Sequence, residues 1–504
     1  MFVHRWLGIA LCLLFLLWFP SGIGMMYWPA FPGVRATDHL EHSPALNAST
    51  IRLSPAEAYA ALGATDPPRD VRLGSFDGRP VYRFRHDFGQ DVVYADTGEV
   101  RDQVSRALLS RVAASWTGQP ADAARIEPIE EVDQWTIQMS LADIAPVWKY
   151  TWPSGDQVYM SETTGEVVQH TTTGSRMAAY VSTIPHWFYF APLRKHGPEW
   201  SRIVIWSSGI GTGLAALGVV LGVWMYSPRK RYRNAGTPTA IPYRGQKRWH
   251  TVLGLTFGVA AATWAFSGML SMDPFPMAGS SVADADAVEG DLERALRGEA
   301  AMDAFTAKDP RAALAELAGS DVKELEFASF AGEPVYMAAL AGGDTRIVPV
   351  AGAVRQEFDR ARITEIIAAT APALAGTRVL DQYDRYYLDR RRQLPLPVIL
   401  AELNDEGESR FYIDPKTARV VGRYNSGNWF ARWVYNGLHS LNFPWLYNYR
   451  PAWDIVVLTF MLGGTALCIT SLVLAWRAVG RALRSGVARP TPEGALGDDL
   501  VVEQ

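Results

Sequence analysis

The sequence is poor in several features that mark common protein classes. Its 504 residues include two cysteines, Cys12 and Cys468, which excludes a disulfide-stapled fold and a CxxC zinc or redox site. The formal net charge is −4, and no basic stripe accompanies a nucleic-acid-binding motif, so no nucleic-acid partner is expected. No GxGxxG follows a predicted strand, so the chain has no dinucleotide-binding fingerprint.

Long apolar runs, by contrast, are abundant. Crossing a bilayer takes about 20 apolar residues, and four segments reach that length: 1–28, 200–226, 249–272 and 452–476. The first segment lacks a good small-x-small cleavage site, so we expect an uncleaved anchor instead of a signal peptide. The sequence therefore predicts a membrane α-helical protein with four transmembrane helices.

The charges on the connecting segments predict an orientation. The short loop 227–248 holds seven Lys and Arg and no acid, and arginines recur in the tail 477–504. By the positive-inside rule, this loop and both termini are expected in the cytoplasm. The polar blocks 29–199 and 273–451 are then expected on the opposite side of the membrane.

The chain contains an internal repeat of about 250 residues. Two stretches match without a gap: His4, Gly8, Ser21, Gly22 and Met26 against His250, Gly254, Ser267, Gly268 and Met272, and His186, Phe190, Leu193, Pro198 and Trp200 against His439, Phe443, Leu446, Pro451 and Trp453. Each half reads as a helix, an outer domain and a returning helix. Both copies then enter the membrane in the same direction, which predicts a pseudo-two-fold axis along the membrane normal.

The repeat brings histidines and glycines into matched positions. At 3.6 residues per turn, Gly8 and Gly22 share a helix face with His4, and Gly254 and Gly268 share one with His250. Such a face suits a haem held between two helices, because glycine admits a flat ligand and imidazole can ligate its iron. Glycine stripes also pack helices together in lipid, and interfacial histidines also serve as anchors.

Two haems are expected, each ligated by one imidazole from each half. Equivalent residues of the two halves should lie at the same depth in the membrane. His4 and His250 then form one pair near the cytoplasmic face, and His186 and His439 form one at the outer face. The predicted cofactor contacts are Gly8, Gly254, Gly22 and Gly268. His196, Met26 and Met272 remain as substitute ligands, whereas the unmatched His39, His42, His86 and His170 are expected to be solvent-exposed or in loops.

Charged residues near these pairs suggest anion contacts. Haem propionates could meet Arg5, Lys247 and Arg248 inside, and Arg194 and Arg450 outside. The basic run Arg385, Arg390, Arg391 and Arg392 could attract an anionic substrate, although a solvated charged face is the simpler interpretation.

The polar blocks have the pattern of small α+β units. Ser54 caps a helix that starts at Pro55, and strands are predicted at 71–76, 81–85 and 92–95. A second unit has strand signals at 134–139, 147–152 and 157–160. The second block repeats this order, with helices near 312–318 and 362–371.

Three segments carry a resemblance to a known family. Residues 92–100 (VVYADTGEV), 158–167 (VYMSETTGEV) and 411–420 (FYIDPKTARV) resemble PepSY units. Joined to the His-bearing spans, they resemble the PepSY-associated transmembrane helix proteins, which include bacterial inner-membrane ferric-siderophore reductases. The resemblance extends from His4 to about Arg477, although residues 346–354 (RIVPVAGAV) lose the Asp-Thr-Gly of the motif.

This resemblance implies two periplasmic PepSY-like domains and haem b held by histidines on the spans of a multi-pass inner-membrane protein. Electrons would pass from a cytoplasmic reductant, namely reduced flavin, a reductase or quinol, to a periplasmic ferric siderophore or other ferric chelate. Two other hypotheses remain open: a non-enzymatic PepSY protein that inhibits a peptidase or senses an envelope ligand, and a quinol-linked electron conduit to another periplasmic protein.

Overall fold

Four long apolar helices form the membrane part of the protein. The computed structural model describes residues 1–28, 31–64, 66–87, 89–101, 104–234, 236–274, 280–298, 300–389 and 391–487. Within them, the helices long and apolar enough to cross a membrane are α1 (Phe2–Tyr27), α9 (Gly197–Met225), α10 (Gly245–Leu270) and α16 (Arg450–Val487). These confirm the four predicted spans. Helix α16 continues beyond the predicted end at 476, because the Arg-, Ala- and Leu-rich stretch that follows favours helix although it is too charged for the bilayer core.

The long helices pack mainly across the two halves of the sequence. Helix α1 packs along α16, and α10 packs along α9 and also along α16. Close approach depends on glycine in α16, since a Cβ at Gly464 would overlap the Phe19 ring and one at Gly463 would overlap the Phe257 ring. The buried residues between the helices are largely aromatic and aliphatic, with Phe15, Phe19 and Trp264 among them.

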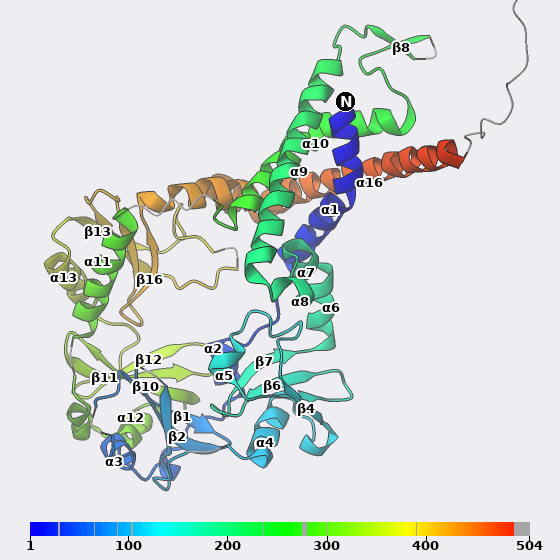
Figure 1. Cartoon of the computed structure of the whole chain (residues 1–504). Coiled ribbons are helices and arrows are strands. Elements are labelled where there is room, and N and C mark those ends of the chain that lie inside the picture. The colour runs from blue at the N-terminus through cyan, green and yellow to red at the C-terminus, as the bar shows by residue number, and fades with distance from the viewer. Residues whose placement is uncertain are drawn as a thin grey trace, which may run out of the picture.

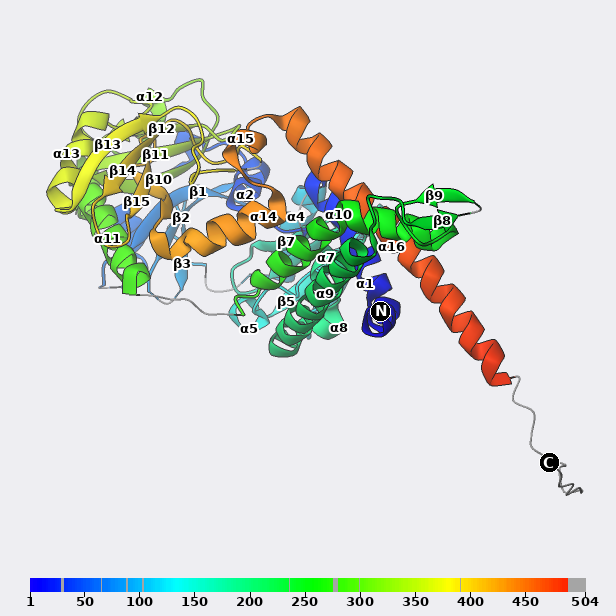
Figure 2. The ribbon, with the colours of Figure 1, turned by 90° about the horizontal axis from the view of Figure 1, so that it is seen from above.

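The sheets lie to one side of these helices. Figure 1 shows the β-rich region beyond one end of the helices, while the N-terminus and a small hairpin, β8 (Tyr232–Asn234) and β9 (Thr237–Thr239), lie at the other end. Figure 2 shows the same separation from above. The β-rich region is joined to the helices through the short helices α6 (Thr173–Val181), α7 (Thr183–Trp187), α8 (Ala191–Arg194), α14 (Leu438–Ser440) and α15 (Pro444–Tyr447).

The largest sheet contains strands from both polar blocks. Its order is β12-β11-β10-β1-β2-β3. The strands are β1 (Asp70–Phe76), β2 (Arg79–Arg85), β3 (Gln90–Tyr94), β10 (Val322–Phe330), β11 (Glu333–Leu340) and β12 (Thr345–Pro349). Strand β1 pairs antiparallel with β10, with Val71 opposite Phe327. The two predicted outer domains, 29–199 and 273–451, therefore share one sheet, which covers the edge strand that each would otherwise expose.

Two four-stranded antiparallel sheets complete the region. The first contains β4 (Arg125–Ile129), β5 (Val147–Thr151), β6 (Gln157–Ser161) and β7 (Val167–Thr171), and the second contains β13 (Leu374–Leu380), β14 (Val398–Leu403), β15 (Arg410–Asp414) and β16 (Arg419–Tyr424). Helix α4 (Arg106–Thr117) packs on the first, and α13 (Arg360–Thr370) on the second. The predicted α+β character of the polar blocks is thus confirmed.

Local predictions within the polar blocks have mixed outcomes. The helix at Pro55 is α3 (Pro55–Ala60), with a capping box between Ser54 and Glu57. Helices α12 (Pro310–Glu316) and α13 occur where helices were expected, and α2 (Ala36–His42) and α11 (Ser280–Arg297) are additional.

The strand predicted at 134–139 is wrong. There the Asp133 carboxylate accepts hydrogen bonds from the backbone N–H groups of Trp135 and Thr136 at 2.9 and 3.1 Å, which holds the chain in a turn.

Candidate functional site

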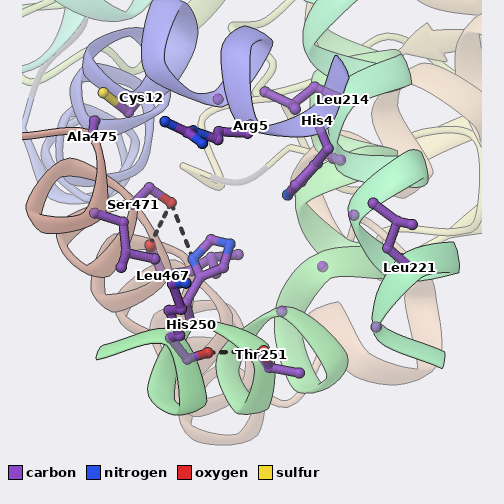
Figure 3. A pocket seen from close by; sticks show the side chains of 18 of the residues that line it. His4, Arg5, Cys12, Leu214, Leu221, His250, Thr251, Leu467, Ser471 and Ala475 are labelled. Atoms are coloured by element: carbon purple, nitrogen blue, oxygen red, sulfur yellow. Dashed lines mark hydrogen bonds between the residues drawn. The ribbon is translucent and has the colours of Figure 1, made fainter. Parts of the chain in front are cut away.

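Two histidines meet in a cavity between the four long helices. His4 on α1 and His250 on α10 face each other with ring centroids 6.2 Å apart and ring planes 44° apart. The cavity encloses about 580 Å³, within the range of cofactor pockets, and is lined by all four helices. In Figure 3, both side chains point into this space from opposite sides. We call His4 and His250 the inner pair.

A second pair of histidines, the outer pair, lies toward the β-rich region. His186 on α7 and His439 on α14 have ring centroids 6.1 Å apart. His186 rests against Ser21 of α1, and His439 against Ser267 of α10. Since His4 and Ser21 are 17 residues apart on α1, a helical rise of 1.5 Å per residue separates the two pairs by about 26 Å. The structure thus places one imidazole pair toward each end of the helices.

Hydroxyl groups hold both outer histidines by the same ring nitrogen. The Ser21 Oγ lies 3.1 Å from His186 Nδ1 and donates to the Leu17 carbonyl at 2.5 Å. The Ser267 Oγ lies 3.1 Å from His439 Nδ1 and donates to the Trp264 carbonyl at 3.3 Å. A hydroxyl that donates to a backbone carbonyl can only accept from the imidazole, so Nδ1 carries the proton. The lone pair is then on Nε2, as in a metal-ligating histidine fixed by its surroundings.

His250 of the inner pair is held in the same manner by α16. The hydroxyls of Thr470 and Ser471 each lie 3.3 Å from His250 Nδ1. Both donate to the Leu467 carbonyl, at 2.7 and 2.9 Å, so both can only accept from the ring. Figure 3 shows the Ser471 contact as a dashed line. The Nε2 of His250 is therefore also left with its lone pair.

The spacing within each pair fits one metal ion between two imidazoles. A bond of about 2 Å from nitrogen to metal and a ring radius of about 1.1 Å put the centroids of two trans imidazoles about 6 Å apart. Aromatic rings that merely pack together span about 4.5–7 Å. Spacing alone therefore decides little, and the Nδ1 contacts make the stronger case for metal ligation.

The predicted glycines fall into two groups. Gly8 and Gly254 line the inner cavity, where a Cβ at Gly8 would meet nothing within 4 Å and one at Gly254 only the Leu467 side chain, at 3.9 Å. A Cβ at Gly22 would instead lie 2.9 Å from the Met461 Cε and 3.4 Å from the His186 Cε1, and one at Gly268 would lie 3.3 Å from the His439 Cε1. The inner glycines thus leave room for a ligand, whereas the outer ones leave room for the imidazoles themselves.

The cations named from the sequence differ in their surroundings. Arg5 and Lys247 line the inner cavity, and Arg248 instead donates to Thr239. Of the two arginines expected near the outer haem, Arg194 has its guanidinium over the Trp200 ring, and Arg450 pairs with Asp454. Arg390, one of the basic run, lies outside the described residues.

His196 and Met26, which the sequence offered as substitute ligands, have other neighbours in the structure. His196 is the residue before the first turn of α9, and the ring that faces His186 is that of His439. Met26 packs in an apolar cluster with Leu446 and Trp453.

Three of the unmatched histidines form a cluster instead of standing alone in solvent. His42 stacks on Trp116 with centroids 4.1 Å apart, and the rings of His39 and His170 meet the same indole at 5.2 and 6.0 Å. Burial lowers the pKa of His39 and His170 below the ordinary histidine value. The expectation of exposed histidines is therefore wrong for these two, because α2 covers the indole on α4 and strand β7 runs beside it.

Some supporting residues were not singled out from the sequence. Trp264 donates its indole N–H to the Leu438 carbonyl at 3.0 Å, which ties α10 to the residue before His439. Arg432, buried in a π-helical turn (Ala431–Gly437), donates to the carbonyls of Arg385 and Asn442 at 2.7 and 3.1 Å. Repeat matching could have found Trp264, since Trp18 occupies the equivalent place in the first half. Nothing local in the sequence marks Arg432.

Comparison with known proteins gives a family for the chain. No curated protein matches the sequence significantly. The family model described as the PepSY-associated TM region matches residues 1–342, which is more than half of the chain. The match includes three of the four long helices, both inner histidines and His186, and it agrees with a multi-pass membrane protein. The chain therefore belongs to the PepSY-associated TM region family.

Proposed function

We propose that this protein is a haem b protein of the bacterial inner membrane that passes electrons from the cytoplasmic side to a periplasmic ferric chelate, most directly a ferric siderophore. The observation that carries the proposal is the arrangement of four histidines in two facing couples, in which hydroxyls lie on the Nδ1 of three of the four rings. In those three rings the lone pair is left on Nε2, which would then be free to ligate a metal.

The proposed orientation follows the positive-inside rule. The Arg- and Lys-rich loop that includes β8 and β9 would be cytoplasmic, together with the N-terminus at the same end of the helices (Figure 1). The β-rich region would then be periplasmic, and the two halves of the chain would be related by a pseudo-two-fold axis along the membrane normal.

The residues of the chain would bind, orient and insulate two haems. His4 with His250 would hold the iron of one haem and His186 with His439 that of the other, while Gly8 and Gly254 leave room in the inner cavity. A bound haem supplies a one-electron Fe(III)/Fe(II) couple, and ligation by two histidines favours electron transfer over oxygen activation. Lys247 and Arg5 line the cavity, where they would meet propionate groups.

The proposed acceptor follows from the chemistry of iron. Reduction of a ferric ion weakens its hold on hard oxygen ligands, which would release Fe(II) from a siderophore. The electron would come from reduced flavin, a separate reductase or quinol on the cytoplasmic side. Aromatic side chains lie beside the outer pair, with Tyr435 stacked on His439 at 5.6 Å, and would form the surface that a bulky chelate approaches.

Optical spectra and haem analysis test the proposal. The purified protein should contain two b-type haems per chain by pyridine haemochrome, and dithionite should shift its Soret band and sharpen its α-band. Adding a ferric chelate to the anaerobically reduced protein should reoxidise the haems and produce Fe(II), measured with a chromogenic Fe(II) chelator. His439→Ala should remove one haem and abolish this reoxidation, while His86→Ala, away from both pairs, serves as the matched control.

A haem-free protein with no spectral change on reduction would refute the proposal. The non-enzymatic hypotheses, peptidase inhibition or envelope sensing, would then stand. Haem present without reoxidation by ferric chelates would favour a quinol-linked conduit to another periplasmic protein.

A further inference from the structure

The two histidines of the inner pair have unequal support. His250 Nδ1 lies 3.3 Å from two hydroxyls, those of Thr470 and Ser471. Among the described residues, no hydroxyl lies on His4 Nδ1, and the backbone contact of this buried ring is the Leu214 carbonyl, just as His250 has the Leu467 carbonyl. Figure 3 shows the same contrast, with a dashed line from Ser471 to His250 and none to His4.

The internal repeat explains this difference. The offset of 253 residues that relates His186 to His439 also relates Leu217 to Thr470 and Gly218 to Ser471. The first half thus has an aliphatic side chain and a hydrogen atom where the second half has two hydroxyls. The other three histidines of the two pairs each have at least one hydroxyl on Nδ1.

Gly218 also shows that a hydroxyl cannot simply be placed beside His4. A Cβ at this position would lie 2.7 Å from the Cε1 of His4, closer than real Cβ atoms approach. The His4 ring therefore packs directly on the backbone of α9, which leaves no space for a side chain to hold Nδ1. No hydroxyl fixes the His4 ring, whereas two hydroxyls fix that of His250.

From this asymmetry we infer that the inner site has one fixed ligand and one exchangeable ligand: His250 anchors the iron, and His4 is the imidazole that a small neutral donor such as carbon monoxide or free imidazole can replace. The inference rests on the proposed function. Outer-shell partners of a metal-bound histidine contribute about 10–100-fold to affinity, and His4 lacks the two hydroxyls that His250 has. The outer pair, with a serine on each imidazole, resists such exchange.

Two single variants test the inequality directly. His4→Ala should keep both haems, with the inner one five-coordinate and high-spin, and added imidazole should restore its low-spin spectrum. His250→Ala should lose the inner haem and keep the outer one, which acts as the internal standard in both variants. Reduced wild-type protein should bind carbon monoxide at no more than one of its two haems.

A double variant tests the cause without removing a ligand. Thr470→Val with Ser471→Ala removes both hydroxyls from His250 and nearly preserves side-chain size, so His250 would have no more support than His4. The affinity for the inner haem should then fall about 10–100-fold. The control is Thr459→Val, also on α16, whose hydroxyl contacts the Ile455 carbonyl and no histidine.

The outcomes separate this inference from the function on which it rests. Wild-type protein that contains no haem would overturn the proposed function. Wild-type protein with two haems, combined with equal inner-haem content and equal spin state in His4→Ala and His250→Ala, would overturn only the inequality. Loss of the inner haem in His4→Ala with retention in His250→Ala would reverse the assignment.

Discussion

The glycines of the inner cavity give a sharp test, because ligand binding and helix packing predict opposite results. Gly8 and Gly254 lie inside α1 and α10 with open space where a Cβ would project. Replacing a helical glycine by a good helix former such as Leu gains about 1 kcal/mol. The double variant Gly8→Leu with Gly254→Leu should therefore raise the free energy of unfolding of the haem-free protein by about 2 kcal/mol.

The same substitutions should abolish binding at the inner site. Two leucine side chains would project into the roughly 580 Å³ cavity between His4 and His250, so haem content should fall from two to one per chain. Pyridine haemochrome measures the content, and thermal unfolding in detergent measures the stability.

Gly213→Leu on α9 is the matched control, since a Cβ there also meets nothing within 4 Å and the position faces outward. It should gain about 1 kcal/mol and keep both haems. A double variant that still binds two haems would refute the idea that these glycines face a cofactor. A loss of stability would instead show that the glycines serve helix packing.

Three further predictions concern other parts of the structure. Ser267→Ala removes the acceptor from His439 Nδ1 and should lower outer-haem affinity about 10–100-fold, seen as selective loss of one haem on dilution. Gly464→Ala places a Cβ against an aromatic ring of α1 and should destabilise the protein by about 1–3 kcal/mol in thermal unfolding. Burial lowers the pKa of His39 and His170 below the value of about 6.5 that histidine has in an unfolded chain. As the pH drops below about 6.5, the unfolded chain therefore binds more protons than the folded one. Stability of the β-rich region should therefore fall as pH drops below that value, and replacing both histidines by Phe should flatten the dependence measured by chemical denaturation.

The predictions that succeeded rest on patterns that lie close together along the chain. Spans are visible because a bilayer requires about 20 consecutive apolar residues, and the Ser54–Glu57 capping box is contained within four residues. The family is visible because its motifs are short. The strand predicted at 134–139 was wrong because the side chain of Asp133 competes for backbone N–H groups, which an alternating pattern does not show.

Features that join distant residues were harder to predict. The pairing of β1 with β10 links strands about 250 residues apart, and each strand alone has the pattern of an ordinary member of its own block. Gly218 and Ser471 stand in apolar runs where small residues are common, so neither is distinctive before α9 and α16 are placed beside the histidines.

By itself, the amino-acid sequence determined the four membrane helices, the α+β character of the polar blocks and the family, because hydropathy and short motifs act through neighbouring residues. It also identified His4, His250, His186 and His439 as residues to be paired, through the spacing of the repeat. Only the tertiary structure decided that these imidazoles face one another in two couples, that the polar blocks share a sheet, and that hydroxyls support His250 and not His4. Those properties depend on which helix faces lie in contact, and contacts between distant segments are fixed by packing of the whole chain.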